Sequence, residues 1–509
     1  MDPSKRVIVN TLAQNIRSLL NIGLSLYSAR IVLDALGESD YGIFSLVGGV
    51  IAMLGCVTNA MVVSTQRHLS FLYGQKDSNG VRAMFSTGLL LHICFGLLLV
   101  LAFVAAEPIV FQSGILKIEP SRLQMANLIY YILIVSLFVS FVTAPYRALF
   151  IARENIVYIS IVDVLDGILK LGLVFILYEI SSDRLVAYAL IVTSISLFNF
   201  AALAGYGKMK YQECCLIPKI FDMKMMKQMS NFAGWTIYST GCIVGRTQGF
   251  AIVLNHFFGE IINSAYGIAM QVTGAVQYVA QSIQNAISPQ IFKAEGTGDR
   301  TQMFAKAEIA SKFSFLLMAI VVIPLVWEMP TILECWLKAV PDYATVFCQY
   351  VLIAALIDQL TIGLGIANQA IGKIRNYSLV INTTKILTLP IAWFCLLKGF
   401  PVISTMWCYL GMEILCTIIR VPFLKYTAGL SVSHFMAHVI VPVVLPVITL
   451  LVSCFLLTQY IQMEYRFIFT ILVSVSLCIP VIWYSALGKN ERRVVCEIIN
   501  KKKYHEIIQ

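Results

Sequence analysis

Charged residues are scarce in this chain. Only 13% of its 509 residues are Asp, Glu, Lys or Arg, whereas 59% are hydrophobic. Soluble domains carry about 25% charged residues, so a chain of this length has too few polar side chains to cover a soluble globule. The hydrophobic share also excludes a disordered chain, which is poor in apolar residues. The composition therefore predicts an integral membrane protein.

Motifs for enzyme and metal chemistry are also absent. The sequence contains no Walker sequence and no G-x-S-x-G elbow, so ATP hydrolysis and serine chemistry have no support. None of its 13 cysteines forms C-x-x-C, which argues against a zinc ribbon. His434 and His438 are four residues apart, but the sequence places no third ligand beside them. We expect no enzyme activity, no cofactor and no metal site.

Long apolar runs predict an all-α polytopic protein. Runs such as 83–106 and 465–487 are nearly continuous, unlike the ~10-residue alternating strands of a membrane barrel. Fourteen candidate spans follow, near residues 7–33, 41–65, 83–106, 124–146, 156–179, 184–206, 231–257, 262–288, 309–330, 343–368, 376–397, 402–424, 434–457 and 465–487.

Positive charge indicates the orientation of these spans. With both termini in the cytoplasm, cytoplasmic segments hold 26 of the 37 Lys and Arg residues and the outer loops hold six. This bias follows the positive-inside rule. The net charge of +10 is therefore a topology signal and an attraction to anionic membrane lipids, and we expect no nucleic-acid partner.

An internal repeat relates the two halves. Gly37-Glu38 and Tyr41-Gly42-Ile43 recur as Gly259-Glu260 and Tyr266-Gly267-Ile268. After the next span, Ser64-x-Gln66 and Asp77 recur as Ser288-x-Gln290 and Asp299. Six spans followed by a six-span copy form a parallel repeat, in which the binding site lies between the halves.

The repeat predicts five segments along the chain. They are an N-lobe at 1–206, a cytoplasmic linker at 207–230, a C-lobe at 231–425, two extra transmembrane helices at 426–488 and a basic cytoplasmic tail at 489–509.

With these features the chain resembles bacterial Wzx-type O-antigen and capsule flippases of the multidrug/oligosaccharidyl-lipid/polysaccharide exporter superfamily. The resemblance rests on the polar first helix, the L-G-x-x-x-Y-G-I loop and the fourteen-span layout. It implies two six-helix lobes in a V shape in the bacterial inner membrane. The implied activity is translocation of undecaprenyl-diphosphate-linked oligosaccharide for lipopolysaccharide or capsule synthesis. A polysaccharide polymerase is then a candidate partner, and we expect a monomer.

Polar residues follow one face of two predicted helices. In the first span they are spaced three and four residues apart, which places them on one face. The second set lies in the eighth span. Such faces line either a water-filled cavity or a packed helix contact; we favour a cavity. The sets are Asn10, Gln14, Arg17, Asn21, Ser25 and Ser28, and Gln271, Gly274, Tyr278, Gln281, Asn285 and Ser288.

Five cations lie inside predicted spans, where a central charge costs at least ~2.5–3.5 kcal/mol on insertion scales. Arg30 has Asp34 four residues on, and Lys170 has Asp166 four residues before it. Arg17, Arg246 and Lys385 have no acid within reach on their own helix. The sequence leaves two roles open for these three: contact with the substrate diphosphate, or pairing with an acid on another helix.

Two acids, Asp358 and Glu413, lie near the middle of their spans. They either load a coupling ion or neutralise Arg246 and Lys385. We therefore expect Arg17, Arg246, Lys385, Gln14, Asn21 and Gln281 in the substrate site, with Asp358, Glu413, Asp166 and Lys170 in ion coupling or charge pairing.

An ion-coupled flippase working by alternating access is the leading hypothesis. The alternative is a drug/cation antiporter of the same superfamily, which should have an acid-rich pocket rather than these three cations. A third candidate is a membrane polysaccharide polymerase or ligase. The longest outer loops, 107–123 and 328–342, contain no His, which argues against it.

Overall fold

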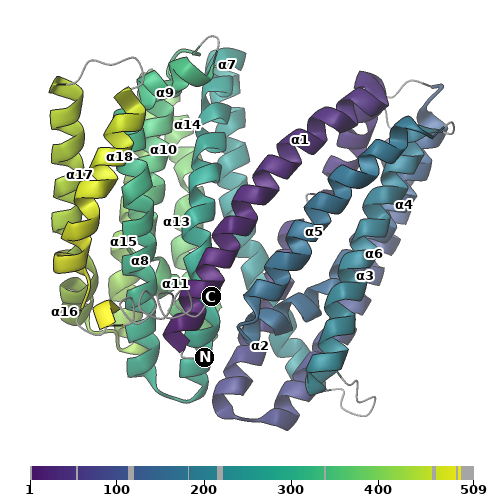
Figure 1. Ribbon diagram of the computed structural model, residues 1–509, viewed down its shortest axis with the longest axis horizontal. Coiled ribbons are helices and arrows are strands. Elements are labelled where there is room, and N and C mark those ends of the chain that lie inside the picture. Colours follow the sequence, from purple (N-terminus) through teal and green to yellow (C-terminus); the bar gives the residue numbers. More distant parts are fainter. Residues whose placement is uncertain are drawn as a thin grey trace, which may run out of the picture. The chain divides into compact units, whose positions relative to one another are not determined.

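The computed structural model describes residues 3–52, 55–112, 120–180, 183–214, 222–337, 340–460, 466–488 and 491–493. Helices dominate these residues and no strand occurs among them, which confirms the all-α prediction (Figure 1). The first half contains α1 (Pro3–Ala52), α2 (Gly55–Gln75), α3 (Ser78–Gln112), α4 (Leu123–Ala152), α5 (Ile156–Val174), η1 (Phe175–Tyr178), α6 (Arg184–Lys210) and η2 (Gln212–Cys214).

The second half begins with one very long helix and has more breaks. It contains α7 (Met223–Gly296), α8 (Arg300–Trp327), α9 (Met329–Trp336), α10 (Ala344–Gln359), α11 (Ile362–Ile371), α12 (Ile374–Tyr377), η3 (Ser378–Asn382), α13 (Thr383–Ile386), α14 (Thr388–Leu397), α15 (Ile403–Ala428), α16 (Val432–Phe435), η4 (Met436–Ile440), α17 (Val441–Tyr460), α18 (Arg466–Val481) and η5 (Ile482–Ala486).

The chain forms two compact units. The N-terminal unit is Val9–Ile237, and the C-terminal unit is Tyr238–Gln509 together with Met1–Ile8. The division falls inside α7, so the end of the predicted linker at 207–230 is already helical. The tail beyond residue 493 lies outside the described residues.

Eight described helices are long and apolar enough to cross a membrane, and the bent pair α10–α11, with an angle of 47°, makes nine. The other five predicted spans, 7–33, 41–65, 156–179, 231–257 and 262–288, fall in α1, α2, α5, η1 and α7, which are not among these nine. The polar faces noted above lie on α1 and α7, and α5 carries three charged residues, Asp163, Asp166 and Lys170. These polar and charged residues account for most of the difference from fourteen.

The repeated Gly-Glu positions share an unusual backbone conformation. Gly37 interrupts α1 with φ 79° and ψ 168°, and Gly259 interrupts α7 with φ 77° and ψ −165°. This region of φ/ψ space is accessible almost only to glycine. Each glycine therefore allows a helix to change direction without ending. As a result, α1 and α7 each run through two spans that the sequence pattern separates.

The second repeated element also has matching local structure. Asp77 accepts a hydrogen bond from the Gly80 amide at 2.8 Å, and Asp299 accepts one from the Gln302 amide at 2.9 Å. Both aspartates thus cap the start of the next helix, α3 and α8 respectively. The equivalent kinks and caps support the internal repeat.

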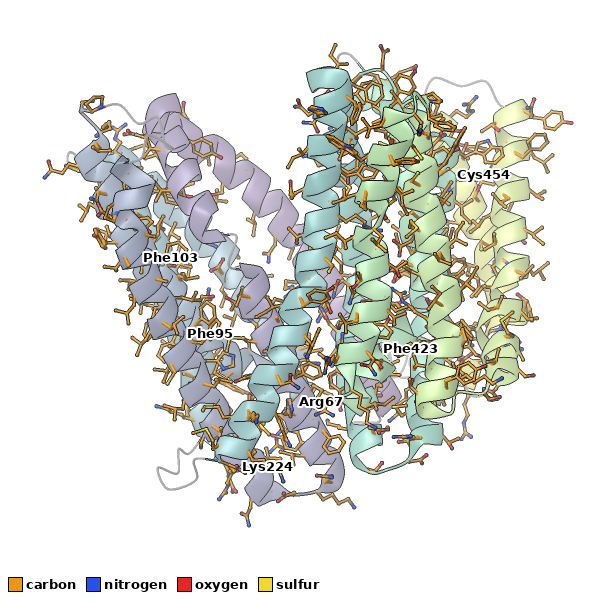
Figure 2. The ribbon with its side chains drawn as sticks, turned by 180° about the vertical axis from the view of Figure 1, so that it is seen from behind. Arg67, Phe95, Phe103, Lys224, Phe423 and Cys454 are labelled. Carbon is orange, nitrogen blue, oxygen red and sulfur yellow. The ribbon has the colours of Figure 1, made fainter. Side chains whose placement is uncertain are left out.

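One helix lies at the centre of each unit's packing. In the N-terminal unit α4 packs against α2, α3 and α6, and in the C-terminal unit α8 packs against α10, α11, α17 and α18. Both central helices are more buried than most of the apolar helices around them. Figure 2 shows Phe95 and Phe103 on the α3 side of the N-terminal unit and Cys454 on α17.

The start of α7 packs within the N-terminal unit. Ser64 donates to the Met229 carbonyl at 3.0 Å, and the Arg67 guanidinium, labelled in Figure 2, lies 5.7 Å from the Phe232 ring centre. Nearby, Glu213 of η2 binds both Arg153 and the Tyr73 hydroxyl. Burial raises the pKa of Tyr73, so its hydroxyl stays protonated and donates to Glu213. These contacts hold η2 and the first residues of α7 against the N-terminal unit.

Candidate substrate cavity and ion clusters

A cavity of about 980 Å³ lies within the N-terminal unit, a volume suited to a drug-sized ligand. Helices α1, α2, α4, α5 and α6 contribute to its wall, and we call it the N-unit cavity. Aromatic, amide, hydroxyl and charged side chains line it, including Asn21, Ser28, Tyr41, Phe44, Asn59, Ser136, Arg147, Asp166, Lys170, Tyr188 and Ser196.

The ion pair in the cavity wall joins Lys170 to Asp166. Lys170 Nζ lies 2.7 Å from Asp166 Oδ2, and the Asn199 amide donates to Asp166 Oδ1 at 2.6 Å. The i, i+4 spacing on α5 predicted this pair from sequence. The Lys170 side chain is 45% exposed, and both residues of the pair line the cavity.

A second acid on α5, Asp163, is held by two arginines. Arg17 Nη1 lies 2.6 Å from Asp163 Oδ2, and Arg147 Nη2 lies 2.5 Å from Asp163 Oδ1. Arg17 therefore finds its carboxylate across helices, while Arg147 both binds Asp163 and lines the cavity. We call Arg17, Arg147, Lys170, Asp163 and Asp166 the N-unit ion cluster.

Some residues on the polar face of α1 pack against other helices, and others line the cavity. The Asn10 amide donates to the Glu154 carbonyl at 3.0 Å, and Gln14 is buried. Asn21 and Ser28 line the cavity, where the buried Asn21 Oδ1 has no hydrogen-bond partner in the described part of the chain. Ser25 and Arg30 have side chains outside the described residues.

The C-terminal unit contains a buried network of five charges. Arg246 Nη1 lies 2.7 Å from Glu413 Oε2, and Lys385 Nζ lies 2.6 Å from Glu413 Oε1 and 3.0 Å from Asp358 Oδ1. Arg420 Nη2 completes the group at 2.8 Å from Asp358 Oδ1. We call these five charged residues the C-unit ion network. Beside them, the Tyr409 ring centre lies 4.4 Å from the Arg246 guanidinium carbon, a cation–π distance.

Arg420 also supports the break between α10 and α11. Its Nη1 atom donates to the Thr361 hydroxyl at 3.1 Å and contacts the Asp358 carbonyl at 3.4 Å. A broken membrane helix needs new partners for its freed backbone groups, and Arg420 contacts one of them, the Asp358 carbonyl. Arg420 lies four residues before the end of the span predicted at 402–424. Its position seven residues after Glu413, on the same helix face, was the signal for burial.

The two groups of charges differ in the exposure of their side chains. Arg17 and Asp163 side chains are 22% and 15% exposed, whereas Arg246 and Glu413 are 7% and 2% exposed. Arg17, Arg246 and Lys385 are not among the residues that line the N-unit cavity. The three cations thus each have a carboxylate partner, and substrate contact by them stays a prediction.

Gln281, the remaining residue of the predicted substrate site, is exposed on α7, and its Nε2 atom lies 3.5 Å from the Asn285 amide oxygen.

The chain is similar in fold to solved structures, but it matches no known family by sequence. No family model and no curated protein matches the chain. The crystal structure of a MATE point mutant gives TM-score 0.74 at 14% identity, and the match covers 86% of this chain and 98% of the mutant's chain. An outward-facing multidrug resistance MATE transporter of the MOP superfamily gives TM-score 0.72 and 12% identity, covering 86% of this chain and 97% of its own.

A third similar structure is a MOP superfamily transporter from Pyrococcus furiosus, whose description reports a binding pocket of reverse polarity. It gives TM-score 0.70 at 14% identity and covers 84% of this chain and 96% of its own. The chain therefore has the polytopic membrane fold of these MATE and MOP superfamily structures.

Proposed function

We propose that the chain is a secondary transporter that exchanges amphipathic solutes for a coupling cation, as a drug/cation antiporter working by alternating access. The observation that carries this proposal is the N-unit cavity, which combines a drug-sized volume with an aromatic and polar wall and a partly exposed ion pair. The likeness to multidrug MATE structures supports it.

Asp166 is the proposed coupling carboxylate. In the described state Lys170 neutralises it at 2.7 Å. A proton or Na⁺ that reaches Asp166 competes with the Lys170 ammonium, which then becomes free to change its contacts in the cavity. A carboxylate that is loaded on one side and released on the other is what an ion-coupled carrier requires.

The test uses purified protein in lipid vesicles and a fluorescent organic cation, ethidium. A proton or Na⁺ gradient should drive ethidium transport by the unmodified protein, and Asp166→Asn should abolish the gradient dependence. Asp342→Asn, which changes an exposed acid far along the chain, should leave transport unchanged. Absence of gradient-driven transport, or a fully coupled Asp166→Asn variant, would reject the proposal.

A flippase for undecaprenyl-diphosphate-linked oligosaccharide in the bacterial inner membrane is the second candidate. One observation favours it: the N-unit ion cluster contains three cations and two carboxylates, and Arg147 and Lys170 line the cavity. The surplus positive charge suits a diphosphate, for which Arg and Lys are good ligands.

Complementation distinguishes the two candidates. If the chain is a flippase, it should restore surface polysaccharide to bacteria that lack their own flippase. Arg147→Ala and Lys170→Ala should then each reduce the polysaccharide at equal membrane abundance, while Lys398→Ala should not. If the chain restores surface polysaccharide but does not transport ethidium, the flippase function is supported and the antiporter function is rejected.

A further inference from the structure

Three potential metal ligands meet where η4 packs against α8. Glu308 lies on α8, His434 on α16 and His438 on η4. One ligand atom from each residue lies within 4.8 Å of the others. Two ligands ~2.1 Å from one tetrahedral zinc ion are roughly 3.4 Å apart, so small side-chain movements bring all three atoms to one ion.

The hydrogen bonds orient His438 for binding. His438 Nδ1 lies 2.9 Å from the His434 carbonyl oxygen. Because a carbonyl only accepts, Nδ1 carries the proton and the lone pair is on Nε2. This is the arrangement that fixes the tautomer of many metal-binding histidines. The His434 and His438 rings stack face to face with centres 3.8 Å apart. The two rings must therefore tilt apart for their in-plane lone pairs to converge on one ion.

Glu308 is the third potential ligand, which the sequence alone did not place beside the histidine pair. Its side chain is 7% exposed, and its carboxylate lies 3.0 Å from His434 Nδ1. A buried carboxylate needs a cationic partner, and a neutral imidazole compensates it only by a hydrogen bond. A divalent cation would neutralise the carboxylate and use both imidazoles.

We propose that Glu308, His434 and His438 form a binding site for a divalent transition metal of the zinc class. Two imidazoles and one carboxylate are a ligand set found in zinc proteins, and imidazole suits zinc better than magnesium or calcium. The bound ion fastens the start of the α16–η4–α17 segment to α8, so it stabilises the attachment of the last two spans to the C-terminal unit.

The experiment uses the full chain in detergent, purified without a polyhistidine tag. Zn²⁺ alone should raise the thermal unfolding temperature, and Co²⁺ should give the visible absorption bands of a site containing nitrogen and oxygen ligands. Equilibrium dialysis should find one tightly bound ion that Mg²⁺ does not displace.

Variants locate the ion. His434→Ala and His438→Ala should abolish the Zn²⁺ shift. Glu308→Gln should weaken Zn²⁺ binding, because an amide lacks the charge of the carboxylate ligand. His256→Ala, which changes a histidine on α7 that stacks on Trp393, should bind zinc as tightly as the unmodified protein. Failure of the folded, unmodified protein to bind Zn²⁺ would overturn the proposal. So would undiminished binding by His438→Ala.

Discussion

Asp358 and Glu413 are outnumbered by the cations around them. The C-unit ion network holds Arg246, Lys385 and Arg420 against these two acids, with every member buried or nearly so. Uncompensated buried charge costs several kcal/mol. Loss of an acid should therefore be worse for stability than loss of a cation, because it leaves three cations facing a single carboxylate.

We expect Glu413→Gln to lower the free energy of unfolding by about 3–5 kcal/mol. Arg246→Met should cost less, since two cations and two acids remain. Adding Arg246→Met to Glu413→Gln should recover part of the loss, a coupling of ~0.5–3 kcal/mol. Thermal unfolding in detergent measures all three, with exposed Glu334→Gln as control. A milder loss for Glu413→Gln than for Arg246→Met would contradict this charge balance.

The same comparison bears on substrate contact by Arg246. If Arg246 binds a diphosphate, Arg246→Met should stop transport while leaving the folded protein abundant. If its role is to balance Glu413, transport should fall in proportion to the loss of folded protein. Measuring membrane abundance beside transport therefore separates the two roles that the sequence leaves open.

At the scale of the helix, Gly259 allows α7 to continue for 74 residues with one interruption. A Cβ at this position meets no atom within 4 Å, so sterics against neighbours do not require glycine. The backbone does, because its φ and ψ lie in a region essentially reserved for glycine. Gly37 has the same property in α1.

We expect Gly259→Ala and Gly37→Ala each to lower the free energy of unfolding by about 1–3 kcal/mol. Gly267→Ala should be neutral or slightly stabilising, because Gly267 has helical geometry, an open Cβ position and alanine is the better helix former. Thermal unfolding of the three variants measures the contrast. Equal effects at Gly259 and Gly267 would show that the kink is not a conformational requirement.

At the scale of the whole molecule, the Lys and Arg distribution predicts that both termini face the cytoplasm. A single cysteine at Gln212 should then be protected from a membrane-impermeant thiol reagent in intact cells, and one at Asp342 should be labelled. The native Cys94 and Cys335 are exposed and must be replaced first. Labelling at Gln212 together with protection at Asp342 would show that the orientation is opposite to the predicted one.

Local sequence patterns were sufficient for properties that depend on neighbouring residues. Scarce charge and long apolar runs predicted the helical membrane fold, and the repeated Gly37 and Gly259 coincide with two equivalent kinks. The pairing of Lys170 with Asp166 was also predictable. It joins residues four apart on one helix, whose regular period brings their side chains to the same face.

Only the tertiary structure decided the partners of the remaining charges. Arg17 binds Asp163 from 146 residues away, Arg246 binds Glu413 from 167, and His434 meets Glu308 from 126. Helical periodicity tells which face a residue occupies but not which helix packs against that face. That choice depends on the packing of every helix in the unit together, which is why the sequence alone left two roles open for these cations.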